Sequence, residues 1–376
     1  APAVQQPAAK PTVAESQSSL GSQLVNFLQP ISTFNPAPAR KATKATNKDC
    51  DHNHPHQWNA SFMVQPPMPP GDPCSVIVNL MTTFVDNADP SKKVAQENTL
   101  RAFQRLRPFG VRAWLFTENV EWARKARENG VEVVARFRKN NANTPCLTYM
   151  YEYIAHNDGC SASTSRVVFD GYVNGDILLG KDLADTMKQV AQVWGQDIKA
   201  KTRGVLVIGF RFNQNIGTKE IKSEAELVEF GKTAKAFQAN AEDYFLFSRG
   251  AVDWQAEIAQ FVVGRPAYDN WLVDHAVHEK KVDVIDATKT IRAIHQTCKD
   301  GVFAGHAPRL DSGFNKNAIN PRTNKKVSNK EWDHGTTNHA HFSSEIKDGQ
   351  VVFKARGKPP GGARTLPASA PPVVAK

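Results

Sequence analysis

The segment Ser75-Val76-Ile77-Val78-Asn79-Leu80-Met81 is an apolar run with the length and β-branched content of a buried strand. A helix is expected after it over 91–106, where apolar residues recur at roughly helical spacing before Pro108. The alternation continues with a strand over 111–117, a helix over 120–129 that ends at Gly130, and a short strand over 131–134. This order is βαβαβ.

The same alternation extends through the middle of the chain. Helices are expected over 145–156, 181–194 and 224–239, and strands over 166–173, 205–210 and 244–247. The pattern predicts an α/β protein with a single Rossmann-like domain, in which helices flank a mostly parallel central sheet. Ligands of such folds bind at the carboxyl ends of the strands.

Composition divides the chain into four expected parts. Residues 1–70 are rich in Pro, Ala and Ser and are expected to form a disordered stem or linker; the alternating histidines of 51–56 could bind a transition metal, but a solvated tract is the simpler interpretation. Residues 71–300 are expected to form the catalytic domain and 301–357 a C-terminal extension or lid over the active site. A disordered tail is expected over 358–376.

The 376 residues carry a net charge of +10, with a pI near 9.3. Much of this charge lies in the expected tails, and no nucleic-acid-binding signature accompanies it, so we expect no nucleic-acid partner. No run of about 18 apolar residues occurs, so membrane attachment is expected only through an anchor missing from this chain. The five cysteines are an odd number, and one glycosylation sequon occurs at Asn59-Ala60-Ser61.

Several common catalytic motifs are missing from the sequence. It has no GxGxxG after the first strand, no GxxxxGK[ST] and no GxSxG, which argues against NAD-type, P-loop and hydrolase sites. The informative segment is instead Tyr172-Val173-Asn174-Gly175-Asp176-Ile177-Leu178-Leu179, where a hydrophobic strand ends in an acidic turn. Asp176 could hold Mn²⁺ or Mg²⁺ together with diphosphate oxygens. The alternative is an ordinary turn with Asx hydrogen bonds.

The acidic turn resembles the modified DxD motif of a GT-A-fold family of nucleotide-diphospho-sugar transferases. Further segments match that family in order across roughly residues 74–300. They are Thr82-Thr83; Phe116-Thr117-Glu118; Asn143-Thr144-Pro145; 243–250; 263–272; and 284–288 with 293–296.

The resemblance implies an enzyme that moves a sugar from a nucleotide diphosphate, most simply UDP, to a hydroxyl of a glycan or glycoprotein. Mn²⁺ or Mg²⁺ would be held by Asp176 and His295, with Asn174 facing the diphosphate. The family's location implies a secretory compartment, most simply the Golgi. The remaining donor-site residues that it implies are Thr82, Thr83, Glu118, Thr144 and Arg211.

The segment Gly264-Arg265-Pro266-Ala267-Tyr268-Asp269-Asn270-Trp271 combines a cation, a carboxylate and aromatic residues. In a transferase Arg265 could pair with phosphate or a carboxylate, Asp269 could act as the catalytic base, and Asn270 and Trp271 could contact the sugar. Alternatively, Asp269 caps a helix that carries Trp271 into the core.

After His295 the chain departs from the family pattern, and His334, His339 and His341 are expected in a loop over the donor site. Three other functions stay open. They are a catalytically silent nucleotide- or carbohydrate-binding module on the same fold, a nucleotidyltransferase, and a basic nucleic-acid-binding protein. The nucleotidyltransferase is disfavoured because Met81-Thr82-Thr83-Phe84-Val85 lacks the usual glycine-rich loop.

Overall fold

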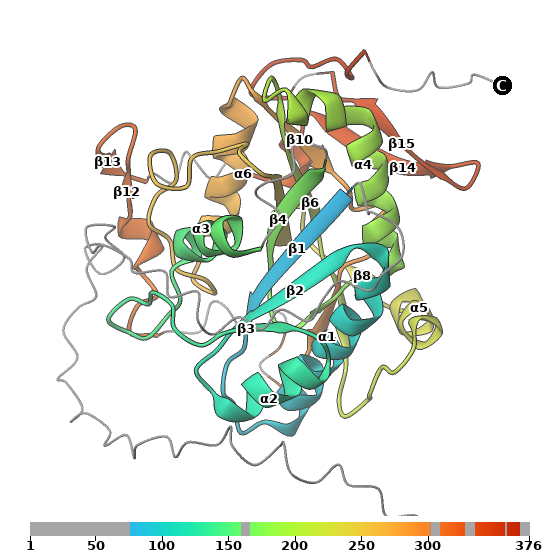
Figure 1. Cartoon of the computed structure of the whole chain (residues 1–376), viewed down its shortest axis with the longest axis vertical. Helices are drawn as coiled ribbons and strands as arrows, with labels where there is room; N and C mark the ends of the chain where they lie inside the picture. Colours follow the sequence, from blue (N-terminus) through green and yellow to red (C-terminus); the bar gives the residue numbers. More distant parts are fainter. Residues whose placement is uncertain are drawn as a thin grey trace, which may run out of the picture. The chain divides into compact units, whose positions relative to one another are not determined.

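A nine-stranded sheet forms the centre of the computed structural model, which describes residues 76–158, 166–299, 301, 309–327, 335–357 and 359–368 (Figure 1). The expected stem over 1–70, with its sequon and histidine tract, lies outside the described residues, as do residues 358 and 369–376 of the expected tail. The strand order is β15 (Gln350–Ala355), β14 (Phe342–Lys347), β10 (Val282–Asp286), β6 (Gly204–Phe210), β9 (Glu242–Ser248), β4 (Val167–Val173), β1 (Val76–Thr83), β2 (Val111–Phe116) and β3 (Glu132–Val134).

The central sheet is mostly parallel, as the sequence predicted. β1 pairs in parallel with both β2 and β4, and β2–β3, β6–β10 and β10–β14 are parallel as well. Strand β9 runs antiparallel between β4 and β6, and β15 runs antiparallel to β14. The carboxyl ends of β1, β2 and β4 therefore meet at one edge of the sheet.

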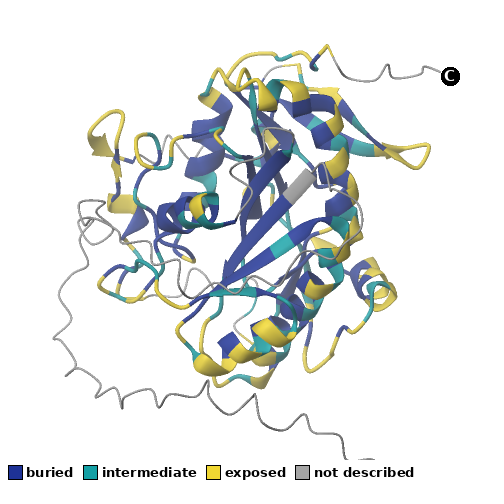
Figure 2. Cartoon of the chain, in the orientation of Figure 1, coloured by how far each residue is buried: buried dark blue, intermediate teal, exposed yellow. Residues whose placement is uncertain are grey.

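Alternating side chains of the strands build two cores. In β2, Ala113 and Leu115 pack with α1 (Pro90–Leu106), α2 (Val120–Glu128) and α4 (Lys181–Lys199). Trp114 and Phe116 face the other way and pack with α3 (Leu147–Asn157) and α6 (Tyr268–His278). The sheet is thus covered by helices on both faces, and its strands are the most buried part of the chain (Figures 1 and 2).

Helix α1 is fixed at its start by local sequence. The Asp89 side chain accepts a hydrogen bond from the Ser91 backbone N–H at 2.9 Å, and Pro90 occupies the first helical position. At the other end a short 3₁₀ turn, Arg107–Phe109, leads to Gly110 in the left-handed conformation. This start sets Lys92 in the first turn of α1, beside the carboxyl ends of the strands.

A second, four-stranded sheet was not expected from the sequence. Its order is β5 (Ile177–Leu178), β11 (Ile294–Thr297), β7 (Phe212–Asn215) and β8 (Lys235–Ala236). The helix expected over 224–239 was too long: α5 spans Glu224–Lys232, because Lys235 and Ala236 pair with β7 instead. In this sheet His295 lies opposite Ile177, the residue after Asp176.

Part of the expected C-terminal extension belongs to the central sheet. β14 pairs with β10, and His341 is buried beneath them, where its Nδ1 accepts from the Val284 backbone N–H at 3.0 Å. His339 ends a short 3₁₀ turn, Thr337–His339, and His334 lies outside the described residues. The remaining elements are a 3₁₀ turn, Asn315–Asn317, and the hairpin β12 (Ile319–Asn320) and β13 (Lys325–Lys326). No helix in the described part of the chain is both long and apolar enough to cross a membrane.

Candidate functional site

A cavity of about 610 Å³ opens at the carboxyl ends of β1, β2 and β4. The parallel pairing brings together the turns after these three strands, although they are far apart in the chain. Most residues that the sequence indicated line this cavity: Thr83, Glu118, Thr144, Asn174, Asp176, Arg211, Arg265, Asp269 and His295.

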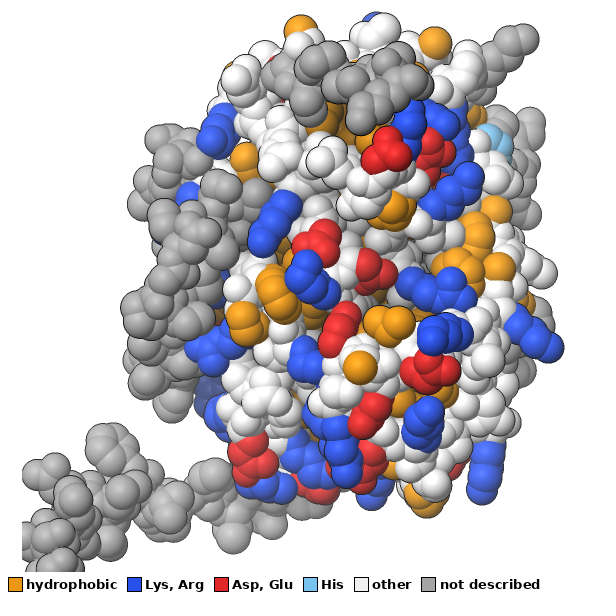
Figure 3. Space-filling model, turned by 90° about the vertical axis from the view of Figure 1, so that its right-hand side faces the viewer, with side chains coloured by type: hydrophobic (Ala, Val, Ile, Leu, Met, Phe, Trp, Pro, Cys, Tyr) orange, Lys and Arg blue, Asp and Glu red, His pale blue; other side chains and the backbone are white. Residues whose placement is uncertain are grey.

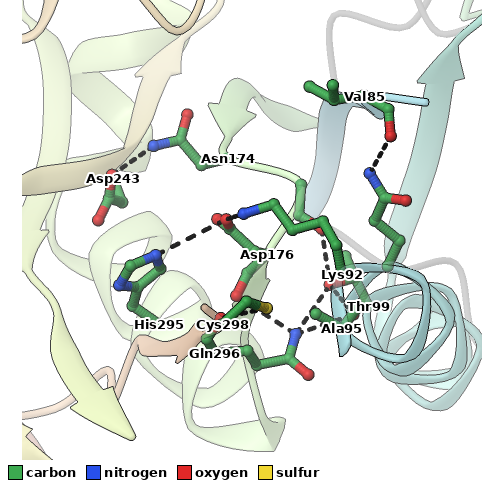
Figure 4. Close-up of polar contacts among 12 residues, drawn as sticks. Val85, Lys92, Ala95, Thr99, Asn174, Asp176, Asp243, His295, Gln296 and Cys298 are labelled. Atoms are coloured by element: carbon green, nitrogen blue, oxygen red, sulfur yellow. Dashed lines mark hydrogen bonds and ion pairs between the residues drawn. The ribbon is translucent and has the colours of Figure 1, made fainter. Parts of the chain in front are cut away.

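Asp176 lies at the centre of a polar cluster in this cavity (Figure 4). Its Oδ2 accepts a hydrogen bond from Lys92 Nζ at 2.8 Å, and His295 Nε2 lies 3.6 Å from the same oxygen. All three side chains are largely buried. Burial opposes ionisation of Asp176, but the charges and hydrogen bonds of His295 and Lys92 outweigh it and hold its pKa well below the ordinary value. Asp176 is therefore a carboxylate at every physiological pH.

His295 is oriented by a residue behind it. Its Nδ1 lies 2.9 Å from Asn213 Oδ1, and an amide oxygen can only accept, so Nδ1 carries a proton. Nε2 then faces Asp176. The arrangement follows from the second sheet, because β11 carries His295 and β7 carries Asn213 as neighbours in register. An outer hydrogen bond of this kind is typical of metal-binding histidines.

Asn174, another residue of the cavity lining, is held in place by β9. Its Nδ2 donates to Asp243 Oδ1, and Asp243 Oδ2 accepts from Arg211 Nη1 at 2.7 Å. Tyr268 Oη donates weakly to Asn174 Oδ1 at 3.4 Å. Arg211 thus lies in the cavity as the sequence predicted, with its charge already paired to Asp243.

Gly175 allows the acidic turn to pass close to the end of β1. A Cβ at this position would overlap the Thr83 carbonyl oxygen and lie 2.8 Å from the Phe84 ring. We expect Gly175→Ala to force a shift of the turn that carries Asn174 and Asp176 and to lower the free energy of unfolding by about 1–3 kcal/mol, measured by denaturant unfolding. Gly357→Ala is the control away from the site, because a Cβ there meets no atom within 4 Å and the backbone is not left-handed. Equal stability of Gly175→Ala and the natural protein would contradict the expectation.

Arg265 forms its hydrogen bonds with other residues of the protein. Its Nε donates to Asp311 Oδ1 at 2.5 Å, and its Nη2 donates to Thr144 Oγ1 at 2.9 Å. Thr144 also donates to Asp311 Oδ2 at 2.6 Å. Of the two partners that the sequence allowed for Arg265, phosphate or a carboxylate, the structure supplies the carboxylate of Asp311. This network fixes the loop before α3 against the loop before α6.

A second cavity of about 440 Å³ adjoins the first and shares Arg211, Asp243 and Asp269 with it as lining residues. Burial and the neighbouring charge of Asp243 raise the pKa of Asp269 to about 6. Glu242, also in this lining, is 1% exposed, and its Oε1 has no hydrogen-bond partner among the described residues. Burial and the charge of Asp269 raise the pKa of Glu242 well above its ordinary value. Asp269 therefore lies between the two cavities with the titration range of a general base.

Three sequence-indicated residues lie elsewhere. Thr82 is buried in β1 and is not among the residues that line either cavity. Trp271 is a core residue, 1% exposed and stacked on His275, so its expected contact with the sugar is not supported. Asn270 lines only the second cavity, where its Nδ2 donates to the Gly335 carbonyl at 2.6 Å. The alternative that Asp269 caps α6 is wrong, because the N-cap is Ala267 and Asp269 lies in the first turn.

The residues present suit a divalent cation in part. A carboxylate oxygen and an imidazole nitrogen that face each other, Asp176 and His295, are ligands that Mn²⁺ accepts. Among the described residues no group of three or more His, Cys, Asp or Glu side chains could hold a metal ion, so the remaining ligands would have to come from phosphate and water. The Asp176 oxygen is also already bonded to Lys92.

Sequence reasoning missed three residues of the site: Lys92, Asp243 and Glu242. Asp243 and Glu242 lie next to each other at the start of β9, and Asp243 stood in a matched segment without a role. Nothing in the local sequence distinguishes Lys92 from the exposed Lys93 that follows it. Only the position of Lys92 in the first turn after β1 could have indicated it.

No protein-family model matches this chain, and no curated protein matches it either. The resemblance to GT-A transferases is therefore an interpretation of short segments. Any function has to be argued from the chemistry of the two cavities.

Proposed function

We propose that the chain is a metal-dependent glycosyltransferase that moves a sugar from a nucleotide diphosphate, most simply UDP, to a hydroxyl of a glycan or glycoprotein. The observation that carries the proposal is the pairing of Asp176 with His295 in a cavity at the carboxyl ends of parallel strands. Asp176 and His295 would hold Mn²⁺ or Mg²⁺. The ion supplies positive charge to the leaving nucleotide diphosphate.

The second cavity supports an acceptor site next to the donor. Asp269 lines both cavities, so a hydroxyl bound in the second could place its proton on this carboxylate as the oxygen attacks the sugar. Asp269 receives the proton, the oxygen–carbon bond to the acceptor forms, and the bond to the diphosphate breaks. Such a direct displacement inverts the configuration at the sugar carbon.

The polar lining of the second cavity suits a hydroxyl-rich acceptor. Asn270, Gln238 and Asn240 provide amide groups, and Phe237 lies beneath the Arg211 guanidinium at 4.9 Å. Amide and carboxyl groups exchange hydrogen bonds with sugar hydroxyls in both directions. A glycan acceptor is the partner that this chemistry favours.

A secretory location, most simply the Golgi, is part of the proposal. Cys146 is disulfide-bonded, and disulfides persist in oxidising compartments rather than in the cytosol. On the face shown in Figure 3, Lys and Arg side chains are mixed with Asp and Glu, and no uniformly basic surface of the kind that binds nucleic acid is visible on that face.

The proposal is tested by binding and turnover of a panel of nucleotide sugars with Mn²⁺, with Mg²⁺ and with chelator. We expect one donor to be bound and used only with metal, and Asp176→Ala to weaken its binding by at least about tenfold, because a charge-assisted ligand is lost. Asp185→Ala, an exposed carboxylate paired with Lys181, is the matched control. Binding of a nucleotide or glycan without turnover would favour the catalytically silent module, and no binding of any donor would overturn the proposal.

A further inference from the structure

In the structure the positive charge bonded to Asp176 is the side chain of Lys92. Lys92 reaches from the first turn of α1 across the cavity, and its Nζ lies 2.8 Å from the carboxylate oxygen that also faces His295 (Figure 4). The Lys92 side chain is 12% exposed and that of Asp176 is 17% exposed, so the pair is shielded from water on most sides. A shielded ion pair is stronger than a surface pair, because less water screens the charges.

Three further cations of the cavity lining are each paired with a carboxylate. Lys139 contacts Glu118 at 2.7 Å, Arg211 contacts Asp243 at 2.7 Å, and Arg265 contacts Asp311 at 2.5 Å. Lys92 and Asp176 form the pair nearest to His295. A diphosphate that entered this cavity would meet Arg309 and three cations that already have carboxylate partners, so additional positive charge would favour its binding.

One rearrangement supplies that charge with residues already in place. If a divalent cation takes the Asp176 oxygen, the Lys92 ammonium loses its carboxylate partner but stays beside it on the rigid first turn of α1. The cavity then gains the charge of the cation and also an ammonium group directed at the same place. A lysine ammonium is a common partner of phosphate oxygens.

We propose that Lys92 is the resident cation of the diphosphate site: it competes with a divalent ion for Asp176 in the donor-free protein and pairs with the diphosphate in the donor complex. The pairing of Lys92 with the diphosphate rests on the proposed function. The competition for Asp176 in the donor-free protein concerns only Lys92, Asp176 and the ion. Lys92 thereby lowers the affinity for metal alone and raises the affinity for metal and nucleotide together.

The test uses the full chain and two titrations. Mn²⁺ is titrated without nucleotide and followed by electron paramagnetic resonance, and UDP is titrated with saturating Mn²⁺ in a calorimeter. For Lys92→Met we expect Mn²⁺ alone to bind about tenfold more tightly and UDP about tenfold more weakly, because one competing charge and one phosphate partner are lost. Lys92→Arg keeps the charge, so we expect its UDP affinity within about threefold of the natural protein.

Lys93→Met is the matched control, because it removes the same charge from the exposed neighbouring position. Opposite shifts of the two affinities in Lys92→Met, absent in Lys93→Met, support the inference. Shifts in the same direction, as a damaged site would give, or no shift, overturn it. If the natural protein binds UDP and Lys92→Met binds it equally well, only the role of Lys92 fails. If the natural protein binds no nucleotide diphosphate at all, the proposed function fails and the diphosphate role of Lys92 fails with it.

Discussion

Asp269→Asn is expected to lower kcat/KM of the proposed transfer by about 10²–10⁴-fold, the usual contribution of a general base. The asparagine amide cannot take up the proton of the attacking hydroxyl. It keeps the side-chain oxygen to which the Asn270 backbone N–H donates a hydrogen bond at 3.0 Å. Binding of the nucleotide should change little, because no hydrogen bond or ion pair among the described residues joins Asp269 to Asp176 or His295. Steady-state kinetics beside UDP calorimetry separate the two effects.

The pH dependence of kcat/KM provides a second test of the role of Asp269. With a pKa raised to about 6 by burial and by Asp243, Asp269 is ionised above that pH and protonated below it. The natural protein should therefore lose kcat/KM as the pH falls through about 6, and the residual activity of Asp269→Asn should not show this step. A profile that is flat between pH 5 and 7, or a step that survives the substitution, would exclude Asp269 as the base.

The same substitution should stabilise the fold at neutral pH. The folded-state pKa of Asp269, about 6, lies above its ordinary value of 3.8, so folding favours the protonated form. The free-energy cost of holding an ionised Asp269 in the folded protein is absent below the ordinary pKa, grows as the pH rises between the two pKa values, and is complete above pH 6. Asp269→Asn should therefore raise the free energy of unfolding by about 1–3 kcal/mol at pH 7 and by little at pH 4. Denaturant unfolding at both pH values measures this, with Asp185→Asn as control.

Arg249→Met is expected to lower the free energy of unfolding by about 3–5 kcal/mol at pH 7. Arg249 donates from Nη2 to Asp158 Oδ2 at 2.7 Å and to Asp170 Oδ1 at 2.6 Å, and from Nε to Asp170 Oδ2 at 2.8 Å. Both aspartates are buried, and Asn79 Nδ2 also donates to each of them. Methionine has a similar length but no charge, so it would remove the cation that bonds both buried carboxylates.

Two comparisons make this result specific. Arg124→Met removes an arginine from an exposed i,i+4 pair with Glu128 and should cost only about 0–0.5 kcal/mol. The loss in Arg249→Met should shrink as the pH falls, because the buried Asp170 carboxylate then becomes protonated and needs no cation. Burial already raises the pKa of Asp170 with Arg249 in place. A loss of less than about 1 kcal/mol at pH 7 would show that the network contributes little to stability.

Much of the central sheet could be predicted because its signals are local. An apolar β-branched run such as 76–83, followed by a helix with Asp89 and Pro90 at its start, reports its own structure through side-chain periodicity and capping. Once the strands are parallel, their carboxyl ends share an edge, so Thr83, Glu118 and Asp176 could be expected near one another.

The short pairings of the second sheet have no such signal. β5 has two residues and β11 has four, too few for a period to be visible, and their partners are distant in sequence. For the same reason the helix expected over 224–239 was extended through β8. β14 and β15 were also missed, because the expected alternation of strands and helices was not continued past residue 300.

Sequence alone was sufficient for the α/β class, for most strands and helices of the central layer, and for the position of the acidic turn Asn174 to Asp176 at the end of a strand, because periodicity and turn chemistry are properties of neighbouring residues. The charge around Asp176 is a different kind of property. It depends on His295 arriving through β11 and on Lys92 arriving through α1. Coulomb interactions act through space over a few ångströms, so they exist only after the fold has brought distant residues together.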